Sequence, residues 1–279
     1  MATDLQPKPE KSKVKEAYDK EALKARWRLL GRDPEQSILS LIRRACYHTF
    51  ARDDWGKVLQ GIKASFVQRD YEGIFTDEEN LQVYSAAYVP GRALCYFEIF
   101  SRPQLRKLLG KACRIFAVGS GSGSELVSVA AAMTRVPAER QQVRLNMQDI
   151  GAWSSVLTCF ETTIRQEWKL TTEQLECVYE QGDVLSKENE SRRNELIAQA
   201  DLITFMFVMN ELFVNKTAAM QLIQTLIQSM KKGALLLIVE SAGSFSHLQI
   251  GGKTYMLYTL LDAVKDLECV VAEDSRWYR

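Results

Sequence analysis

The sequence predicts an α/β fold in which a helical subdomain precedes a doubly wound, Rossmann-like parallel sheet. Two observations carry this prediction. After residue 110, short apolar segments alternate with segments of helical periodicity, which is the pattern of βαβ units. Before residue 110, apolar residues recur at helical spacing only. The chain of 279 residues is long enough for one α/β domain with a helical appendage.

The N-terminal third is expected to have two parts. Residues 1–34 are polar, with four lysines from Lys8 to Lys15, and predict a basic, disordered or marginally helical tail. Residues 35–110 predict the helical subdomain. Its first two helices follow from the periodic positions Ile38, Leu41, Ile42 and Cys46, and Trp55, Leu59, Ile62, Phe66 and Val67. Asp77 is a predicted N-cap, and Pro90 is expected to interrupt the chain before a helix over 92–100.

The remaining residues, 111–279, predict the sheet domain. Strands are expected at 114–118, 143–148, 175–180, 201–208, 234–240 and 267–273, and helices at 124–134, 153–167, 191–199, 215–230 and 253–265. The strands at 114–118 and 234–239 are uninterrupted apolar runs, so we expect both to be central and buried on both faces.

Composition and charge limit the cellular compartment and the kinds of partner that we expect for this protein. No apolar run approaches the roughly 18 residues that span a membrane, and no secretory signal opens the chain. Six scattered cysteines and two histidines indicate no disulfide framework and no metal site, so we expect an intracellular protein. Residues 1–110 carry 19 Lys+Arg against 15 Asp+Glu, a net charge of +4, and the rest carry 17 against 20, a net of −3. A basic N-terminal part permits a polyanionic partner.

A glycine-rich loop follows the first strand. Gly119, Ser120, Gly121 and Gly123 stand where a parallel sheet binds ligands, at the carboxyl end of a strand. The helix after the loop would point free N–H groups at a ligand. A tight strand-to-helix turn without a ligand remains the alternative.

Polar residues also end the next three strands. Asp149, followed by Ile150, ends the second strand and would accept the hydroxyls of a ribose. Asp183, followed by Val184, ends the third and would accept from an adenine amino group. Asn210 and Glu211 end the fourth. Each of these residues has helix capping as its structural alternative.

The identity of the nucleoside cofactor follows from charge. Glu125 directly follows the glycine loop, where a carboxylate would repel the pyrophosphate of a dinucleotide. S-adenosylmethionine (SAM) carries no phosphate, and its sulfonium and ammonium are cationic. The loop therefore favours SAM over NAD.

Several motifs together resemble the fungal methyltransferases that modify N3 of uridine in large-subunit (25S) ribosomal RNA. The motifs are Gly119–Leu126, Asp149–Val156, Asn210–Phe213, Arg69–Tyr71, Tyr84–Tyr88, Pro90–Tyr96, Glu240–Ser244, and Tyr255–Met256 through Leu261–Asp262. The resemblance covers residues 38–279. It implies a class I SAM-dependent methyltransferase with ribosomal RNA or a pre-ribosome as partner, in the cytoplasm or the nucleus and nucleolus, without a membrane.

The resemblance also implies roles for individual residues. Glu211 would receive the proton of uridine N3 and Asn210 would orient the base edge, while Arg92, Tyr88 and Tyr84 would close over cofactor and base. For these three, packing of the helical subdomain is the alternative, and Trp153 would line the adenine pocket or anchor its helix. Two other functions stay open: a SAM-binding sensor or assembly factor without catalysis, and a small-molecule methyltransferase.

One departure from the family concerns the end of the sheet. The sequence stops after the predicted sixth strand, where the family continues with a hairpin and an antiparallel seventh strand. The fold is therefore expected to lack its last strand and to leave an edge of strand 234–240 unpaired. We expect the sixth strand to pair there, or a dimer or another partner to form through that edge.

Overall fold

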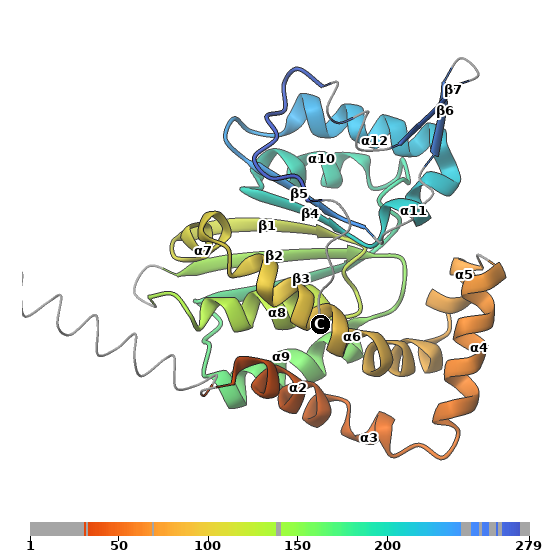
Figure 1. Cartoon of the computed structure of the whole chain (residues 1–279), viewed down its shortest axis with the longest axis vertical. Coiled ribbons are helices and arrows are strands. Elements are labelled where there is room, and N and C mark those ends of the chain that lie inside the picture. The colour runs from red at the N-terminus through yellow and green to blue at the C-terminus, as the bar shows by residue number, and fades with distance from the viewer. Residues whose placement is uncertain are drawn as a thin grey trace, which may run out of the picture.

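The computed structural model describes residues 31, 33–68, 70–137, 141–240, 247–250, 253–256, 261 and 264–273. The basic tail predicted for residues 1–34 lies almost wholly outside them. Five strands of the described part form a parallel sheet in the order β3-β2-β1-β4-β5 (Figure 1). They are β1 (Ala112–Val118), β2 (Gln142–Asp149), β3 (Leu175–Gln181), β4 (Leu202–Met206) and β5 (Leu235–Val239). The order reverses between β1 and β4, and a ligand site is expected at such a switch point.

Helices cover both faces of this sheet, as the doubly wound prediction requires. Helices α8 (Ser124–Met133) and α9 (Ser154–Trp168) lie on one face, and α10 (Glu190–Gln199) and α12 (Lys216–Ser229) lie on the other (Figure 1). A short helix, α11 (Met209–Leu212), and a 3₁₀ turn, Phe213–Asn215, lead from β4 into α12. The four long helices confirm the predicted ranges to within about two residues at each end.

The helical subdomain precedes the sheet and contains no strand among its described residues. Its helices are α2 (Pro34–Ala45), α3 (Tyr47–Phe50), α4 (Trp55–Gln68), α5 (Tyr71–Phe75), α6 (Glu78–Phe100) and α7 (Pro103–Leu109). Asp77 caps α6 as predicted, because its carboxylate accepts from the Glu79 amide at 2.9 Å. Val67, expected on the buried face of α4, is instead 87 % exposed.

The prediction that Pro90 interrupts the chain is wrong. Helix α6 runs through Pro90 without a break for 23 residues. A proline costs a helix one hydrogen bond and a steric clash, but both halves of α6 are held by burial. The fully buried residues of α6 include Val83 and Val89 before Pro90 and Ala93 after it.

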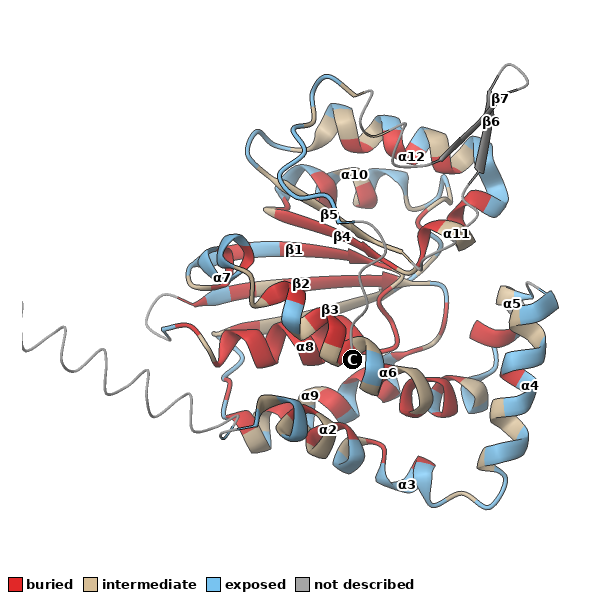
Figure 2. Ribbon diagram, viewed as in Figure 1, coloured by how far each residue is buried: buried red, intermediate tan, exposed pale blue. Residues whose placement is uncertain are grey.

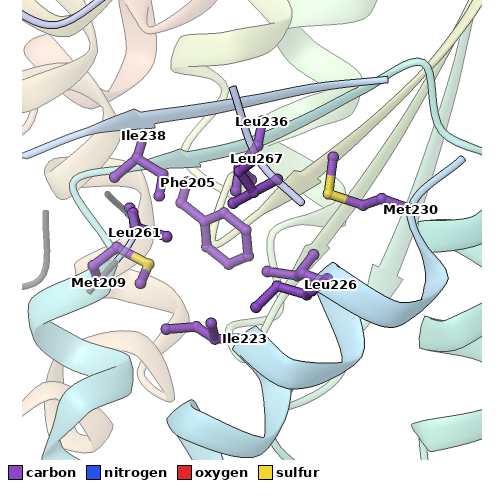
Figure 3. A pocket seen from close by; sticks show the side chains of 10 residues that line it. Phe205, Met209, Ile223, Leu226, Met230, Leu236, Ile238, Leu261 and Leu267 are labelled. Atoms are coloured by element: carbon purple, nitrogen blue, oxygen red, sulfur yellow. The ribbon is translucent and has the colours of Figure 1, made fainter. Parts of the chain in front are cut away.

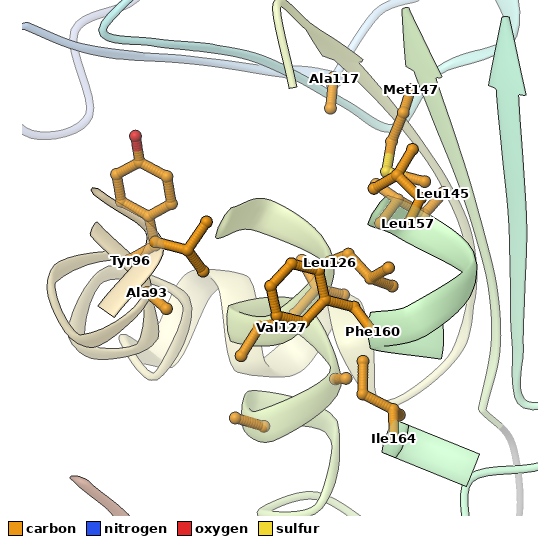
Figure 4. Close-up of a cluster of buried hydrophobic side chains, with 14 of the residues drawn as sticks. Ala93, Tyr96, Ala117, Leu126, Val127, Leu145, Met147, Leu157, Phe160 and Ile164 are labelled. Carbon is orange, nitrogen blue, oxygen red and sulfur yellow. The ribbon is translucent and has the colours of Figure 1, made fainter. Parts of the chain in front are cut away.

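One hydrophobic core joins the helical subdomain to the lower face of the sheet. Ala93 and Tyr96 of α6 lie against Leu126 and Val127 of α8, with Phe160 of α9 beyond them (Figure 4). Every residue of α8 is buried, and its small side chains at 130–132 allow close packing (Figure 2). The position of α6 beside the glycine loop is therefore fixed by core packing.

Strand β5 differs from its prediction. Strand β4 is buried throughout, whereas all five residues of β5 are only half-buried (Figure 2). The reason is position: β5 pairs with β4 on one side and ends the sheet, so it is not a central strand within the described residues. Strand β4 also ends at Met206, two residues before its predicted limit.

Two predictions for the C-terminal segment fail in its described residues. Of the helix predicted over 253–265, residues 257–260 and 262–263 lie outside the described part of the chain, and Leu261 is helical. Residues 253–256, expected in a helix, form β7 (Lys253–Met256), which pairs antiparallel with β6 (His247–Ile250). The sequence between them is Gly251-Gly252, a strong two-residue hairpin signal that the helical spacing of the following apolar residues obscures. Residues 267–273, expected as a sixth strand beside β5, have irregular backbone with one bend and no strand. A dimer or partner at the β5 edge stays a prediction.

The irregular C-terminal segment nevertheless packs against the sheet. Leu261 and Leu267 close a small apolar gap of about 10 Å³ between β4, β5 and α12 (Figure 3). Its lining offers no polar side chain to orient a ligand, so the gap is a packing feature of the second core. Glu273 pairs with Arg102 at 2.6 Å. None of the described helices is both long and apolar enough to cross a membrane.

Candidate cofactor site

The glycine loop occupies the switch point, between the end of β1 and the start of α8. Gly123 adopts φ +94°, which side chains disfavour, and a Cβ there would lie 2.6 Å from the Phe160 ring. A Cβ on Gly121 would lie 1.8 Å from Cδ1 of Trp153, so only glycine fits between loop and indole. The Ser120 hydroxyl donates to the Ala117 carbonyl at 3.1 Å, which ties the loop to its own strand.

Asp149 joins the loop to the end of β2. Its Oδ2 accepts from the Gly121 amide at 3.0 Å, and its Oδ1 accepts from the Gly151 amide at 3.0 Å and from Trp153 Nε1 at 2.7 Å. Burial raises the pKa of Asp149, and these donors oppose the rise. A carboxylate offers about four acceptor positions, so three are used within the protein. The arrangement favours an organising role for Asp149 over capture of two ribose hydroxyls.

The neighbouring strand ends hold the other predicted nucleoside contacts. Ile150 is a large apolar side chain that is 38 % exposed beside Asp149, which suits contact with a flat base. Asp183 is exposed and caps its own loop, with Oδ1 accepting from the Leu185 amide at 2.8 Å. Val184 is buried in the second core, so the fold does not bring its side chain to this surface.

The subdomain contributes Arg92, which lies in an aromatic cage at the other side of the loop. Arg92 donates to the Tyr84 hydroxyl at 2.6 Å. Its guanidinium carbon is 5.4 Å from the Tyr84 ring, 5.6 Å from the Tyr88 ring and 5.5 Å from the Phe207 ring. Burial opposes the charge of Arg92, yet the Tyr84 hydroxyl and the Glu211 carboxyl raise its pKa. The structure thus brings together all three predicted residues of the subdomain, Arg92, Tyr88 and Tyr84.

Phe207 is a member of this cage that sequence reasoning missed. It follows β4 with φ +60°, a left-handed conformation that is strained for a bulky side chain. Its amide donates to the Val239 carbonyl at 2.7 Å, and its ring stacks on Tyr96 with centroids 6.1 Å apart. The turn places the chain so that Asn210 and Glu211 follow at the same edge. A left-handed phenylalanine leaves no signal in the sequence.

More than one carboxyl group lies near the single cation of Arg92. Glu211 is half-buried in α11, and burial, aided by Asp149 and Glu240 and opposed by Arg92, raises its pKa to about 8. The backbone N–H of Asn210 donates to Oε2 of Glu240 at 3.4 Å. Burial raises the pKa of Glu125, in the first turn of α8, to about 8. Carboxyls this perturbed at the carboxyl ends of the strands mark a candidate functional site.

The residues present fit SAM on two observations. Glu125 Oε1 is a buried carboxyl oxygen without a hydrogen-bond partner in the described part of the chain, and the acids Glu125 and Glu211 lie near the buried cation of Arg92. A ligand with an ammonium, a sulfonium and a carboxylate supplies cations to the acids and an anion to Arg92.

A switch-point glycine loop suited to such a ligand defines the class of protein as SAM-dependent methyltransferases. The chain belongs to the SAM-dependent methyltransferase family whose model matches residues 42–279. The predicted α/β fold is confirmed, and SAM is the cofactor of this family.

Individual proteins are also similar to this chain. The 25S rRNA (uridine(2843)-N(3))-methyltransferase of Saccharomyces cerevisiae is 28 % identical over 259 residues, covering 79 % of this chain and 71 % of the yeast protein. An O-methyltransferase family protein from Burkholderia thailandensis is 16 % identical with a TM-score of 0.40. That match covers 72 % of this chain, which spans about half, 52 %, of the bacterial chain.

Proposed function

We propose that this chain methylates N3 of a uridine in large-subunit ribosomal RNA. The single observation that carries the chemistry is Glu211, a half-buried carboxyl with a pKa of about 8 at the end of β4, beside Arg92 and Asp149. The choice of RNA rests on the yeast relative, whose printed activity is uridine-N3 methylation of 25S rRNA. An enzyme acting on ribosomal RNA would work in the cytoplasm or in the nucleus and nucleolus, with a pre-ribosome as partner.

In the proposed mechanism, different residues position the two reactants and remove the proton from uridine N3. When bound, SAM supplies an electrophilic methyl carbon on a sulfonium. The N3–H of uridine is a poor nucleophile until its proton leaves, and the Glu211 carboxylate accepts that proton. N3 would take the methyl group as the bond from that carbon to sulfur breaks. The charges would balance, because Glu211 would become a neutral carboxylic acid and the sulfonium would become a neutral thioether.

The remaining site residues would position the two reactants. The Asn210 amide can donate to and accept from the Watson–Crick edge of uridine, which orients N3 towards the loop. Tyr88 and Phe207 present aromatic faces near Arg92, and such faces stack on bases that have left a helix. Our proposed cofactor residues remain Gly119, Ser120, Gly121, Gly123, Asp149, Ile150 and Asp183, with Asp149 holding the loop. Val184, whose side chain is buried in the second core, would contribute only its backbone.

The test is methylation of deproteinised ribosomal RNA with isotopically labelled SAM, followed by mass spectrometry of the digested nucleosides. We expect label in N3-methyluridine from large-subunit RNA and not from small-subunit RNA. Glu211→Gln should bind SAM normally but lower the rate by about 10²–10⁴-fold, the usual contribution of a general base. For the wild type, the rate should rise as the pH approaches 8, because only the carboxylate accepts a proton.

The contrary outcomes separate the alternatives. SAM binding without label in any RNA, protein or metabolite would favour a sensor or an assembly factor. Label in a small metabolite but not in RNA would favour a small-molecule methyltransferase. A Glu211→Gln variant with an unchanged rate would remove Glu211 from the chemistry, whatever the substrate.

A further inference from the structure

Glu125 is a buried carboxyl for which the mechanism so far has no use. It is the second residue of α8, directly beyond the glycine loop, and only 2 % of it is exposed. Its Oε1 has no hydrogen-bond partner in the described part of the chain. An acid in the first turn of an exposed helix stabilises the helix dipole, but a buried and incompletely paired one is costly. The fold therefore keeps a buried acidic group without a matching cation.

The groups that act on Glu125 do not supply that cation. From α6, Arg92 and Tyr96 face it, and Asp149 faces it from the end of β2. Arg92 is engaged by the Tyr84 hydroxyl and its aromatic cage, and no ion pair within 4.0 Å joins Glu125 to any cation of the described residues. Asp149 adds a second negative charge. Burial, aided by Asp149 and opposed by Arg92, raises the pKa of Glu125 to about 8, so the carboxyl is mainly protonated at neutral pH.

We propose that Glu125 is a cofactor-binding residue whose carboxylate receives the α-ammonium of SAM. The ammonium is the better match of the two cations, because it carries N–H donors for Oε1 and the sulfonium carries none. Arg92, on α6, would then meet the α-carboxylate of the same amino-acid group. The inference rests on the cofactor site proposed above and extends it to a residue outside the glycine loop.

Proton release on binding follows from this pairing. A cation beside Glu125 favours its charged form, so the bound complex holds the carboxylate where the free protein holds the acid. In the window between the ordinary value of 4.5 and the free-protein pKa of about 8, ligands with the ammonium should expel up to one proton from Glu125. Their affinity should therefore fall by up to about tenfold for each pH unit below 8.

Three nucleoside ligands isolate the ammonium. S-adenosylhomocysteine carries the ammonium without the sulfonium, and 5′-methylthioadenosine carries neither. Calorimetry at pH 7 in phosphate and in Tris, whose ionisation enthalpies differ, counts the protons released. We expect Glu125→Gln to weaken SAM and S-adenosylhomocysteine by about 10–100-fold and to lose their proton release. Methylthioadenosine should bind both proteins equally and without pH dependence from this group.

The matched control is Glu173→Gln, the same substitution at an exposed position beyond the opposite end of the sheet. It should leave all three affinities unchanged. The proposal would be overturned if Glu125→Gln and the wild type bound SAM with equal affinity. It would also be overturned if the variant lost as much affinity for methylthioadenosine as for SAM. If the glutamine variant does not fold, the wild type decides: its S-adenosylhomocysteine affinity must depend on pH more steeply than its methylthioadenosine affinity. A wild type that binds none of the ligands would instead refute the proposed site as a whole.

Discussion

At the scale of single residues, Asp149 connects most of the loop. Its two oxygens bind the amides of Gly121 and Gly151 and the indole of Trp153, so loop, strand end and helix start share one acceptor. This explains why a residue predicted as a ribose ligand is already occupied within the protein. The same contacts make it the position where loop geometry is most easily disturbed.

We therefore expect Asp149→Asn to loosen the loop. An asparagine amide turns one acceptor into a donor, which loses at least one hydrogen bond to a charged group, worth about 1.5–3 kcal/mol. Denaturant unfolding should show a stability loss of that order, together with weaker SAM binding. Trp153→Phe removes one donor but keeps a ring, and should lose less stability than Asp149→Asn. Equal stability of Asp149→Asn and wild type would show that these contacts contribute nothing net.

The residues that sequence predicted and those it missed differ in their physical basis. Gly121, Asp149 and Glu211 could be placed because strand ends and glycine turns have local signals, and parallel strands bring their carboxyl ends to one edge. Phe207 could not be found, since its left-handed backbone is imposed by tertiary contacts. Glu125 was visible, but whether its carboxyl is buried and unpaired depends on α6, which lies far away in sequence.

At the scale of elements, α6 shows that tertiary packing can override a local sequence preference. The proline rule predicts a break at Pro90, yet the helix continues because residues on both sides are buried against α8 and the sheet. In the hairpin β6–β7 the local signal is the correct one. Its two-glycine turn predicts a hairpin, but the helical spacing of the apolar residues after it favours a helix. The five strands of the sheet were predictable because apolar runs and connecting helices agreed with each other.

The cost of Pro90 should be measurable. Pro90→Ala returns an N–H to the interior of α6 and removes a ring clash, and alanine is favoured over proline there by up to about 3 kcal/mol. We expect the variant to be more stable by about 1–3 kcal/mol in chemical unfolding. Gly91→Ala, one residue along the same helix at an exposed position, gives the matched comparison and should gain about 1 kcal/mol at most. A less stable Pro90→Ala variant would show that the proline shapes a bend the core requires.

At the scale of the whole molecule, the acidic site should make stability depend on pH. Burial raises the pKa of Glu125 from 4.5 to about 8, so the folded protein holds this proton more tightly than the unfolded chain does. The stabilisation is complete below pH 4.5 and is lost as the pH rises towards 8. Glu211 acts in the same direction, reduced by its partial exposure to solvent.

The free protein is thus expected to unfold more easily at pH 8.5 than at pH 5.5, by on the order of a few kcal/mol. Denaturant titrations at both values give the difference directly. Glu125→Gln carries no titrating group at that position and should flatten the dependence, whereas Glu173→Gln should keep it. Saturating SAM should also flatten it, because the cation takes over the role of the proton. A wild type whose stability is equal at both pH values would contradict the raised pKa.

The cage around Arg92 has a consequence for protein engineering. Its cation comes from α6, while the acids around it come from α8, β2 and α11. A chimaera that transplants only the sheet half onto another recognition module would carry the loop and the carboxyls but leave their counter-charge behind. Such a graft would keep every glycine of the motif and still present a cluster of acidic groups without its cation. The smallest transferable unit of this site therefore includes α6 together with the sheet.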